Sequence, residues 1–166
     1  MKSDLIMNFS VDKENKTVNI KREFNASLSN VWSAWTEPEI LDQWWAPAPF
    51  KSKTKSMDFK EGGRRLYAMV SPEGNENWSF FEYTFISPKT NFKHTSTFCD
   101  ADENPIPNFG SSLWDITFSE QGELTVVDIA IKRDTLAEIE QIIAMGFKEG
   151  FTSALQGLDK ILEARK

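Results

Sequence analysis

The C-terminal stretch from Thr135 to Arg165 constrains the fold most, because its apolar residues recur at three- and four-residue steps. No proline interrupts the stretch, and Asp134 can cap its start. The pattern therefore predicts one long helix. Its bulky apolar face is formed by Phe147, Phe151, Leu155, Leu158 and Leu162.

A second line along the same predicted helix carries small residues, which are Gly146, Gly150, Ser153 and Gly157. Each glycine inside a helix costs about 1 kcal/mol relative to alanine, so three on one line indicate a structural reason. Either another backbone approaches closely there, or the line leaves room for a cavity. We interpret the helix as part of the core and as one wall of a candidate cavity.

The size and charge of the chain limit the other possibilities. Its 166 residues suffice for one sizeable core, and we expect a single domain over residues 1–166. The formal net charge is −6 without a basic stripe, so neither nucleic acid nor an anionic membrane is an expected partner. The single cysteine fits a reducing compartment. No signal-peptide core or membrane-spanning segment is evident, which predicts a soluble cytoplasmic protein.

Ahead of the long helix the sequence predicts mostly strands. Residues 8–11 and 17–26 alternate around a polar turn and predict a hairpin, with residues 1–16 as an N-terminal strand extension. Two short helices follow, one capped by Ser27 or Ser29 and one starting at Pro38. Further strands are expected at 51–60, 64–71, 78–87, 91–99, 112–120 and 123–133, with 100–109 irregular. This order predicts an α+β fold in which an antiparallel sheet wraps around the long helix.

Several motifs resemble one known family. Residues 31–39 (VWSAWTEPE) followed by 44–47 (WWAP) are similar to the AHSA-type proteins, homologues of an activator of the heat-shock protein ninety ATPase, in the START-like or SRPBCC superfamily. Supporting motifs come in the same order: residues 57–64 with their diglycine, the turn at 72–74, and the closing helix. The resemblance extends from about Val18 to the C-terminus.

The resemblance implies a helix-grip fold, with a curved antiparallel sheet of about six to seven strands around the C-terminal helix. It also implies an internal cavity that in relatives takes apolar or amphipathic small molecules. It does not imply one activity, because the family includes binding proteins, a eukaryotic co-chaperone and, in related branches, a few catalysts. Relatives often have an aromatic residue directly after Gly-Gly-Arg, where this chain has Arg65.

Arg65 shares strand parity with Tyr67 and Met69. If that face lines the cavity, the guanidinium enters it and needs an anionic partner, either Glu82 on the next strand or a ligand carboxylate. The alternative is that the head of Arg65 lies in solvent, two residues past Gly63. We expect the diglycine itself to form a hairpin turn with positive φ, rather than a phosphate-binding loop.

The titratable residues give few candidates for catalysis. His94 and Cys99, each the only one of its kind, lie five apart on one predicted strand and therefore point to opposite faces. They cannot form a nucleophile and base pair, and no catalytic residue, metal ligand or cofactor is predicted. His94 remains open as a lone acid or base or as an ordinary hydrogen-bonded residue. Alternation predicts that Asp115 and Asp128 face water, whereas Glu82 is ambiguous.

Trp44 and Trp45 form an adjacent aromatic pair before Pro47. They either line the mouth of a pocket or anchor the two short helices on the sheet. On a helix they point about 100° apart, so at most one faces the cavity.

These patterns together predict a small-molecule-binding protein with a mostly apolar cavity between sheet and helix. Two alternatives stay open: a protein-interaction module of the co-chaperone or stress-response kind, and an enzyme using acid–base chemistry on a hydrophobic ligand. The expected partner is a small hydrophobic or amphipathic molecule, with chaperone binding and self-association left open. The candidate lining residues are Trp45, Arg65, Tyr67, Met69, Glu82, His94, Trp114, Gly146, Phe147 and Gly150.

Overall fold

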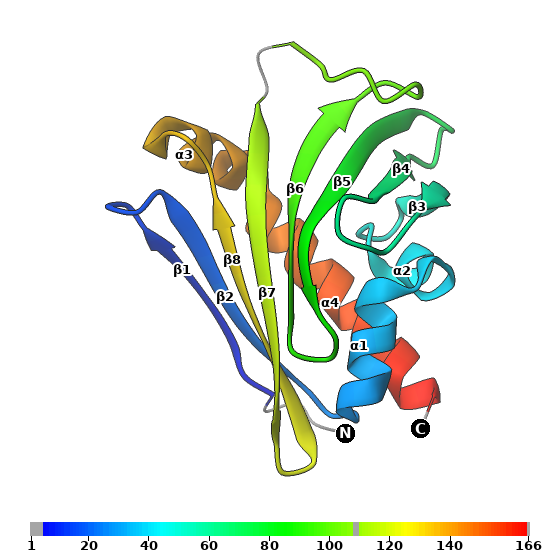
Figure 1. Cartoon of the computed structure of the whole chain (residues 1–166), viewed down its shortest axis with the longest axis vertical. Coiled ribbons are helices and arrows are strands. Elements are labelled where there is room, and N and C mark those ends of the chain that lie inside the picture. Colours follow the sequence, from blue (N-terminus) through cyan, green and yellow to red (C-terminus); the bar gives the residue numbers. More distant parts are fainter. Residues whose placement is uncertain (1–4, 108–109, 166) are drawn as a thin grey trace.

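The computed structural model describes residues 5–107 and 110–165. In these residues an 8-stranded antiparallel sheet has the strand order β1-β2-β8-β7-β6-β5-β4-β3. Figure 1 shows helix α4 running diagonally behind the curved sheet, from α3 at upper left toward α1 at lower right. The predicted α+β fold, with an antiparallel sheet around the C-terminal helix, is confirmed.

The helices and strands occur in the predicted order, apart from the division of the last helix, and their bounds lie close to the predicted ones. The helices are α1 (Leu28–Thr36), α2 (Pro38–Trp44), α3 (Leu136–Ala144) and α4 (Phe147–Ala164). The strands are β1 (Met7–Asp12), β2 (Thr17–Phe24), β3 (Lys51–Met57), β4 (Arg64–Val70), β5 (Glu76–Ser87), β6 (Asn91–Cys99), β7 (Ser111–Gln121) and β8 (Leu124–Lys132).

The sheet has one strand more than the six to seven that the family resemblance implies, and it agrees with the eight strand segments predicted from alternation. The N-terminal extension supplies the additional strand, because β1 pairs antiparallel with β2 and forms one edge of the sheet. Residues 1–4 of that extension, residues 108–109 of the irregular segment and residue 166 lie outside the described residues.

The C-terminal helix differs from its prediction, since it is two helices and not one. Helix α3 ends at Ala144, α4 begins at Phe147, and Gly146 between them has a φ of +91°. That backbone conformation suits glycine and interrupts the helical hydrogen bonding. The apolar spacing continues on both sides of the break, so periodicity alone could not reveal it. The N-cap of α3 is Thr135 rather than Asp134, and it forms a capping box with Glu138.

The apolar face of α4 is buried against the inner face of the sheet, as its spacing predicts. Phe151, Leu155, Leu158 and Leu162 are all buried in the main hydrophobic core. The glycine line has no backbone packed against it at two positions. An added Cβ at Gly157 would meet nothing within 4 Å, and at Gly150 only the side chain of Pro47, at 3.7 Å. Close approach of another backbone is therefore not the reason for these two glycines.

The turn at Gly62-Gly63 fixes the start of β4. Gly62 has a φ of +85°, which confirms the predicted turn. An added Cβ on Gly63 would lie 2.1 Å from the backbone oxygen of Asp58, so only glycine fits there. Both glycines bond to β5, with Gly62 N donating to Tyr83 O at 2.8 Å and Tyr83 N donating to Gly63 O at 2.9 Å. Arg65, two residues further on, is thereby placed on the inner face of the sheet.

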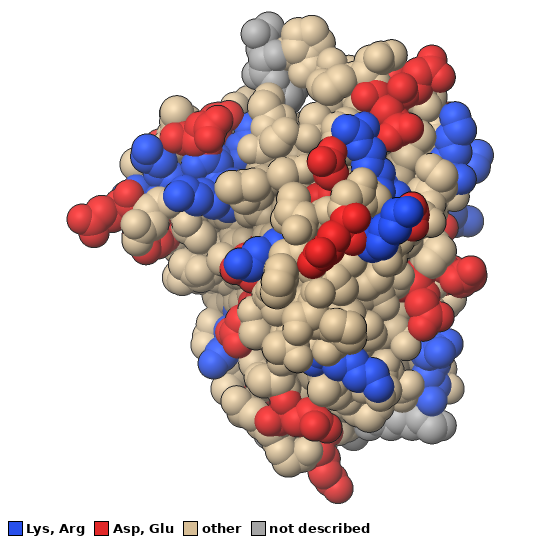
Figure 2. Space-filling view, in the orientation of Figure 1, with Lys and Arg blue, Asp and Glu red and all other residues tan. Residues whose placement is uncertain are grey.

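On the outer face of the sheet, Figure 2 shows acidic and basic side chains interspersed rather than gathered by sign. Asp115 and Asp128 lie on this face with about half of each side chain exposed, at 46% and 48%, as alternation predicts. Among the described residues, no helix combines the length and apolar character needed to cross a membrane.

Candidate functional site

A row of flat side chains crosses four neighbouring strands on the inner face of the sheet. It consists of Arg65 on β4, Phe81 on β5, His94 on β6 and Trp114 on β7. The rings of Phe81 and His94 stack at 4.0 Å, those of His94 and Trp114 stack at 5.6 Å, and the Arg65 guanidinium carbon lies 5.3 Å from the Phe81 centroid. Register produces the row, since Arg65 pairs directly with Phe81, and His94 with Trp114. We call these four residues the stacked row.

Two aromatic rings from the helical layer cover the stacked row. The Trp45 ring, at the end of α2, lies 5.4 Å from Phe81 and 5.7 Å from Trp114. Phe151 on α4 lies 6.0 Å from Trp45 and 5.9 Å from Trp114. Trp45 Nε1 also donates to the Tyr67 hydroxyl at 3.1 Å, which fixes the orientation of the indole.

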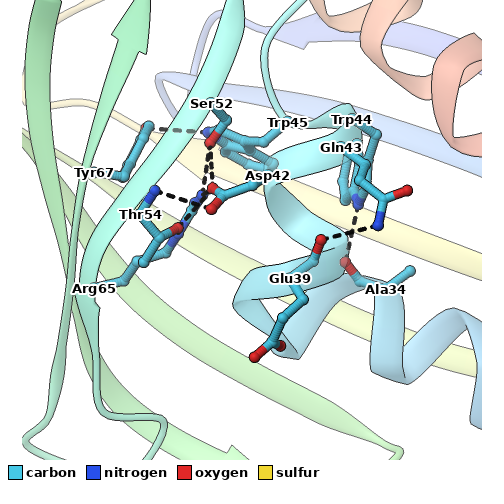
Figure 3. Close-up of polar contacts among 10 residues, drawn as sticks. All are labelled: Ala34, Glu39, Asp42, Gln43, Trp44, Trp45, Ser52, Thr54, Arg65 and Tyr67. Carbon is cyan, nitrogen blue, oxygen red and sulfur yellow. Dashed lines mark hydrogen bonds and ion pairs between the residues drawn. The ribbon is translucent and has the colours of Figure 1, made fainter.

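Only one member of the tryptophan pair reaches this region, as helical geometry predicts. Trp44 turns away and donates from Nε1 to the backbone oxygen of Ala34 at 2.9 Å, which joins α2 to α1. Figure 3 shows the two indoles pointing in different directions, with Trp45 beside Tyr67 and Trp44 beside Ala34. Trp44 therefore joins the two short helices, as the anchoring interpretation expects, whereas a pocket-lining role for Trp45 stays a prediction.

Arg65 is completely buried, so its head does not lie in solvent. Its Nε donates to Thr54 Oγ1 at 3.2 Å, and its Nη2 donates to Ser52 Oγ at 3.0 Å and to Asp42 Oδ1 at 3.4 Å. In Figure 3 these groups converge from β4, β3 and α2. Asp42, not Glu82, is thus the acidic partner of Arg65.

Asp42 was missed by sequence reasoning, although the adjacent strand carries a signal for a polar inner face. In β3, lysines 51, 53 and 55 alternate with Ser52, Thr54 and Ser56. Asp42 accepts hydrogen bonds from the hydroxyls of Ser52 and Thr54 and from the backbone N–H of Thr54. Alternating lysine and hydroxyl residues indicate an inner face that needs a polar partner.

The guanidinium of Arg65 is incompletely satisfied by the described residues. Its Nη1 is buried and has no hydrogen-bond partner there. The 3.4 Å separation from Asp42 exceeds the roughly 2.7–2.9 Å of a strong charge-assisted bond. Burial lowers the pKa of Arg65, and Asp42 is one of the groups that oppose this shift.

His94 is also buried, with 1% of its surface exposed. Its Nδ1 lies 3.1 Å from the backbone oxygen of Thr95. Because a carbonyl oxygen only accepts, Nδ1 must carry the ring hydrogen, which leaves Nε2 as a lone-pair acceptor. Within the described residues Nε2 has no partner. Burial lowers the pKa of His94 to about 3, and the charge of Arg65 adds to this effect, so the ring is neutral at physiological pH.

Glu82 lies on the outer face, where it accepts from Arg64 Nη2 at 2.9 Å and has 42% of its side chain exposed. The prediction that it lines the interior is wrong. The ambiguity arose because Trp78 and Phe80, which share its parity, belong to a second, smaller apolar cluster with Leu66 and Cys99. Both faces of β5 are therefore apolar at this end. Cys99 lies in that cluster and His94 in the interior, so the two lie apart as predicted.

The remaining candidates lie around the covered row at different depths. Tyr67 is buried within the core, with its ring 4.1 Å from the Arg65 guanidinium carbon. Met69 and Phe147 are half-buried, and Phe147 stacks on Phe151 at 5.4 Å. Gly146 is the break between α3 and α4, while Gly150 faces Pro47.

Packed aromatic rings fill the part of the interior where a cavity is expected, and the cavity itself stays a prediction. The structure does contain a shallow groove of about 220 Å³ on the outer face, across β1, β2, β8 and β7. Among its lining residues are Asn19, Lys21, Asp128 and Ala130. Lys21 and Asp128 form an ion pair across it at 4.0 Å.

Comparisons with solved structures agree with this fold. A protein named Ms6760 from Mycobacterium smegmatis is 26% identical, with a TM-score of 0.88 over 98% of this chain and 99% of that one. A protein from Arthrobacter aurescens is 23% identical, with a TM-score of 0.88 over 95% and 91%. An AHSA1 protein from Silicibacter pomeroyi is 19% identical, with a TM-score of 0.72 over 90% and 99%. The last two likenesses concern the fold alone.

No curated protein matches the chain. The family model described as "Activator of Hsp90 ATPase homolog 1-like protein" matches residues 25–163. That range contains the sheet from β3 onward, helices α1 to α3, all of α4 except its last residue, and every residue of the stacked row. The chain therefore belongs to the family of activator of Hsp90 ATPase homolog 1-like proteins.

Proposed function

We propose that the protein binds a small aromatic or hydrophobic acid between the inner face of the sheet and α4, with the ligand carboxylate at Arg65. The fold family commonly binds hydrophobic ligands. The observation that carries the proposal is the buried Nη1 of Arg65, which has no partner among the described residues.

The energetic argument starts from this unpaired donor. A buried donor without a partner costs about 1–3 kcal/mol, and more when the group is charged. A ligand oxygen that accepts from Nη1 removes that cost on binding. A carboxylate is favoured over a neutral acceptor because Asp42 is held at 3.4 Å and is shared with Ser52 and Thr54.

The surroundings of the guanidinium favour a flat apolar body for the ligand. The guanidinium carbon lies 4.1 Å, 5.3 Å and 5.8 Å from the ring centroids of Tyr67, Phe81 and Trp45. Such rings offer flat apolar surface to an aromatic ligand. Because they are closely packed, the ligand must displace part of the cover formed by Trp45 and Phe151. At Gly150, next to Phe151, the only atom within 4 Å of an added Cβ is Pro47 Cγ, at 3.7 Å.

The test compares 2-naphthoic acid with its amide by calorimetry, using the wild type and Arg65→Met. We expect the wild type to prefer the acid by about tenfold, which corresponds to one charge-assisted hydrogen bond of about 1.4 kcal/mol. Arg65→Met should bind acid and amide alike, since methionine keeps an apolar stem but has no donor.

Arg64→Met is the matched control. Arg64 is the neighbouring residue on the outer face, where it bonds to Glu82 and Glu103. This variant should retain the full preference for the acid. If Arg65→Met, shown to be folded by its cooperative melt, keeps the same preference as the wild type, Arg65 has no part in recognition and the proposal fails.

A further inference from the structure

Besides Arg65 Nη1, the stacked row contains a second buried polar atom without a partner among the described residues, which is His94 Nε2. The two atoms have opposite hydrogen-bonding character. Arg65 Nη1 is a donor, whereas His94 Nε2 is an acceptor, because Nδ1 holds the ring hydrogen for Thr95 O. A histidine that serves only packing would be expected to have both ring nitrogens satisfied. In this protein only Nδ1, the nitrogen nearer its own backbone, is satisfied among the described residues.

His94 lies on the same inner face of the sheet as Arg65, and both contact Phe81. Both side chains project from the inner face, from β6 and β4 on either side of β5. Phe81 lies between them, stacked on His94 at 4.0 Å and 5.3 Å from the Arg65 guanidinium carbon. Nε2 is at the end of the imidazole away from Cβ, and it is buried without a partner among the described residues.

We infer that His94 Nε2 accepts a hydrogen bond from the ligand, and that the ligand is an aromatic acid with a hydroxyl or N–H group at the end away from its carboxylate. This inference rests on the proposed function and narrows its ligand class. The carboxylate binds Arg65, the aromatic body covers Phe81, and the donor at the far end binds His94. Arg65 and His94 thus bind opposite ends of one ligand molecule.

The neutral state of His94 is essential to this arrangement. A protonated imidazole would present two donors and would reject a hydroxyl hydrogen at Nε2. Burial and the charge of Arg65 both disfavour protonation, so the acceptor persists through the physiological pH range. No proton transfer is involved, and the ligand leaves the site unchanged.

The binding test uses three acids that differ at one position: 2-naphthoic acid, 6-hydroxy-2-naphthoic acid and 6-methoxy-2-naphthoic acid. The wild type should bind the hydroxy acid about tenfold more tightly than the unsubstituted acid, because the hydroxyl satisfies a buried acceptor. The methoxy acid should show no such gain, since it has the oxygen but not the donor. In His94→Phe, which keeps a flat ring between Phe81 and Trp114, the gain of the hydroxy acid should disappear.

A second measurement does not depend on that variant folding. His94 is the only histidine, so nitrogen-15 NMR of the imidazole gives a single pair of ring signals. In the free protein Nδ1 should be protonated and Nε2 unprotonated. Adding the hydroxy acid should shift the Nε2 signal toward hydrogen-bonded values, whereas the methoxy acid should not. A protonated Nε2 in the free protein, or binding of the hydroxy acid without a shift of Nε2, would overturn the inference.

The outcomes separate this inference from the function it rests on. If all three acids bind the wild type equally, and Arg65→Met still removes the preference for acid over amide, then the role of His94 is wrong and the proposed function stands. If none of the acids binds, or if Arg65→Met keeps the preference for acid over amide, both the role of His94 and the proposed function are wrong.

Discussion

Arg65 and His94 are polar residues inside an aromatic core, and strand alternation predicts only part of their setting. Strand alternation predicts that Arg65 and Tyr67 lie on the same face of the sheet, and the structure confirms this. Alternation could not decide whether the guanidinium reaches solvent, because that depends on Asp42, Ser52 and Thr54, which are 11 to 23 residues away in the chain. For His94, the tautomer follows from one bond to Thr95 O that no sequence pattern indicates.

The buried His94 should make the stability of the protein depend on pH. Its folded pKa of about 3 lies below the ordinary value of 6.5 in the unfolded chain, so between these values only the unfolded chain binds the proton. The contribution of His94 to the free energy of unfolding should therefore be fully present above about pH 6.5. It should decrease as the pH falls below that value, by at most about 1.4 kcal/mol per pH unit.

Urea unfolding of the wild type and His94→Phe, between about pH 4.5 and 7.5, isolates this contribution because acidic residues affect both proteins equally. The free energy of unfolding should fall more steeply with decreasing pH in the wild type than in the variant. Parallel pH curves for the two proteins would show that His94 is not protected from protonation in the folded state.

At the scale of elements, sequence patterns located the strands and helices well but misjudged one junction. Strand β6 begins and ends at the predicted residues, and Ser27 caps α1 by accepting from the backbone N–H of Asn30. The break between α3 and α4 was missed, because the three- and four-residue spacing of apolar residues continues across Gly146. A glycine with positive φ and a glycine in a helical turn look identical in a sequence.

The two kinds of glycine should respond oppositely to alanine. Gly146 has a φ of +91°, where an alanine is strained, so Gly146→Ala should destabilise the protein by about 1–2 kcal/mol. Gly157 lies inside α4 with open space around its missing Cβ, so Gly157→Ala should stabilise by up to about 1 kcal/mol. Chemical denaturation of both variants checks this pair. A stabilised Gly146→Ala would mean that α3 and α4 can form one continuous helix.

For the whole molecule, order of elements and motif resemblance were enough to predict the architecture, but they could not predict how the interior is filled. The fold follows from local alternation, capping and the apolar face of α4, all of which are visible in the sequence. The stacked row depends on register across four strands, and register is set by pairing between distant segments. Sequence reasoning therefore placed Tyr67, His94 and Trp114 among the candidates without showing how they would be arranged.

The location of bound 2-naphthoic acid shows whether the protein binds this ligand between the sheet and α4. Intermolecular nuclear Overhauser effects between the acid and the protein report which side chains touch it. Binding beneath α4 predicts contacts to the ring protons of Trp45, Phe81 and Trp114. Contacts confined to the outer-face groove, at Asn19 and Ala130, would contradict a binding site in the interior.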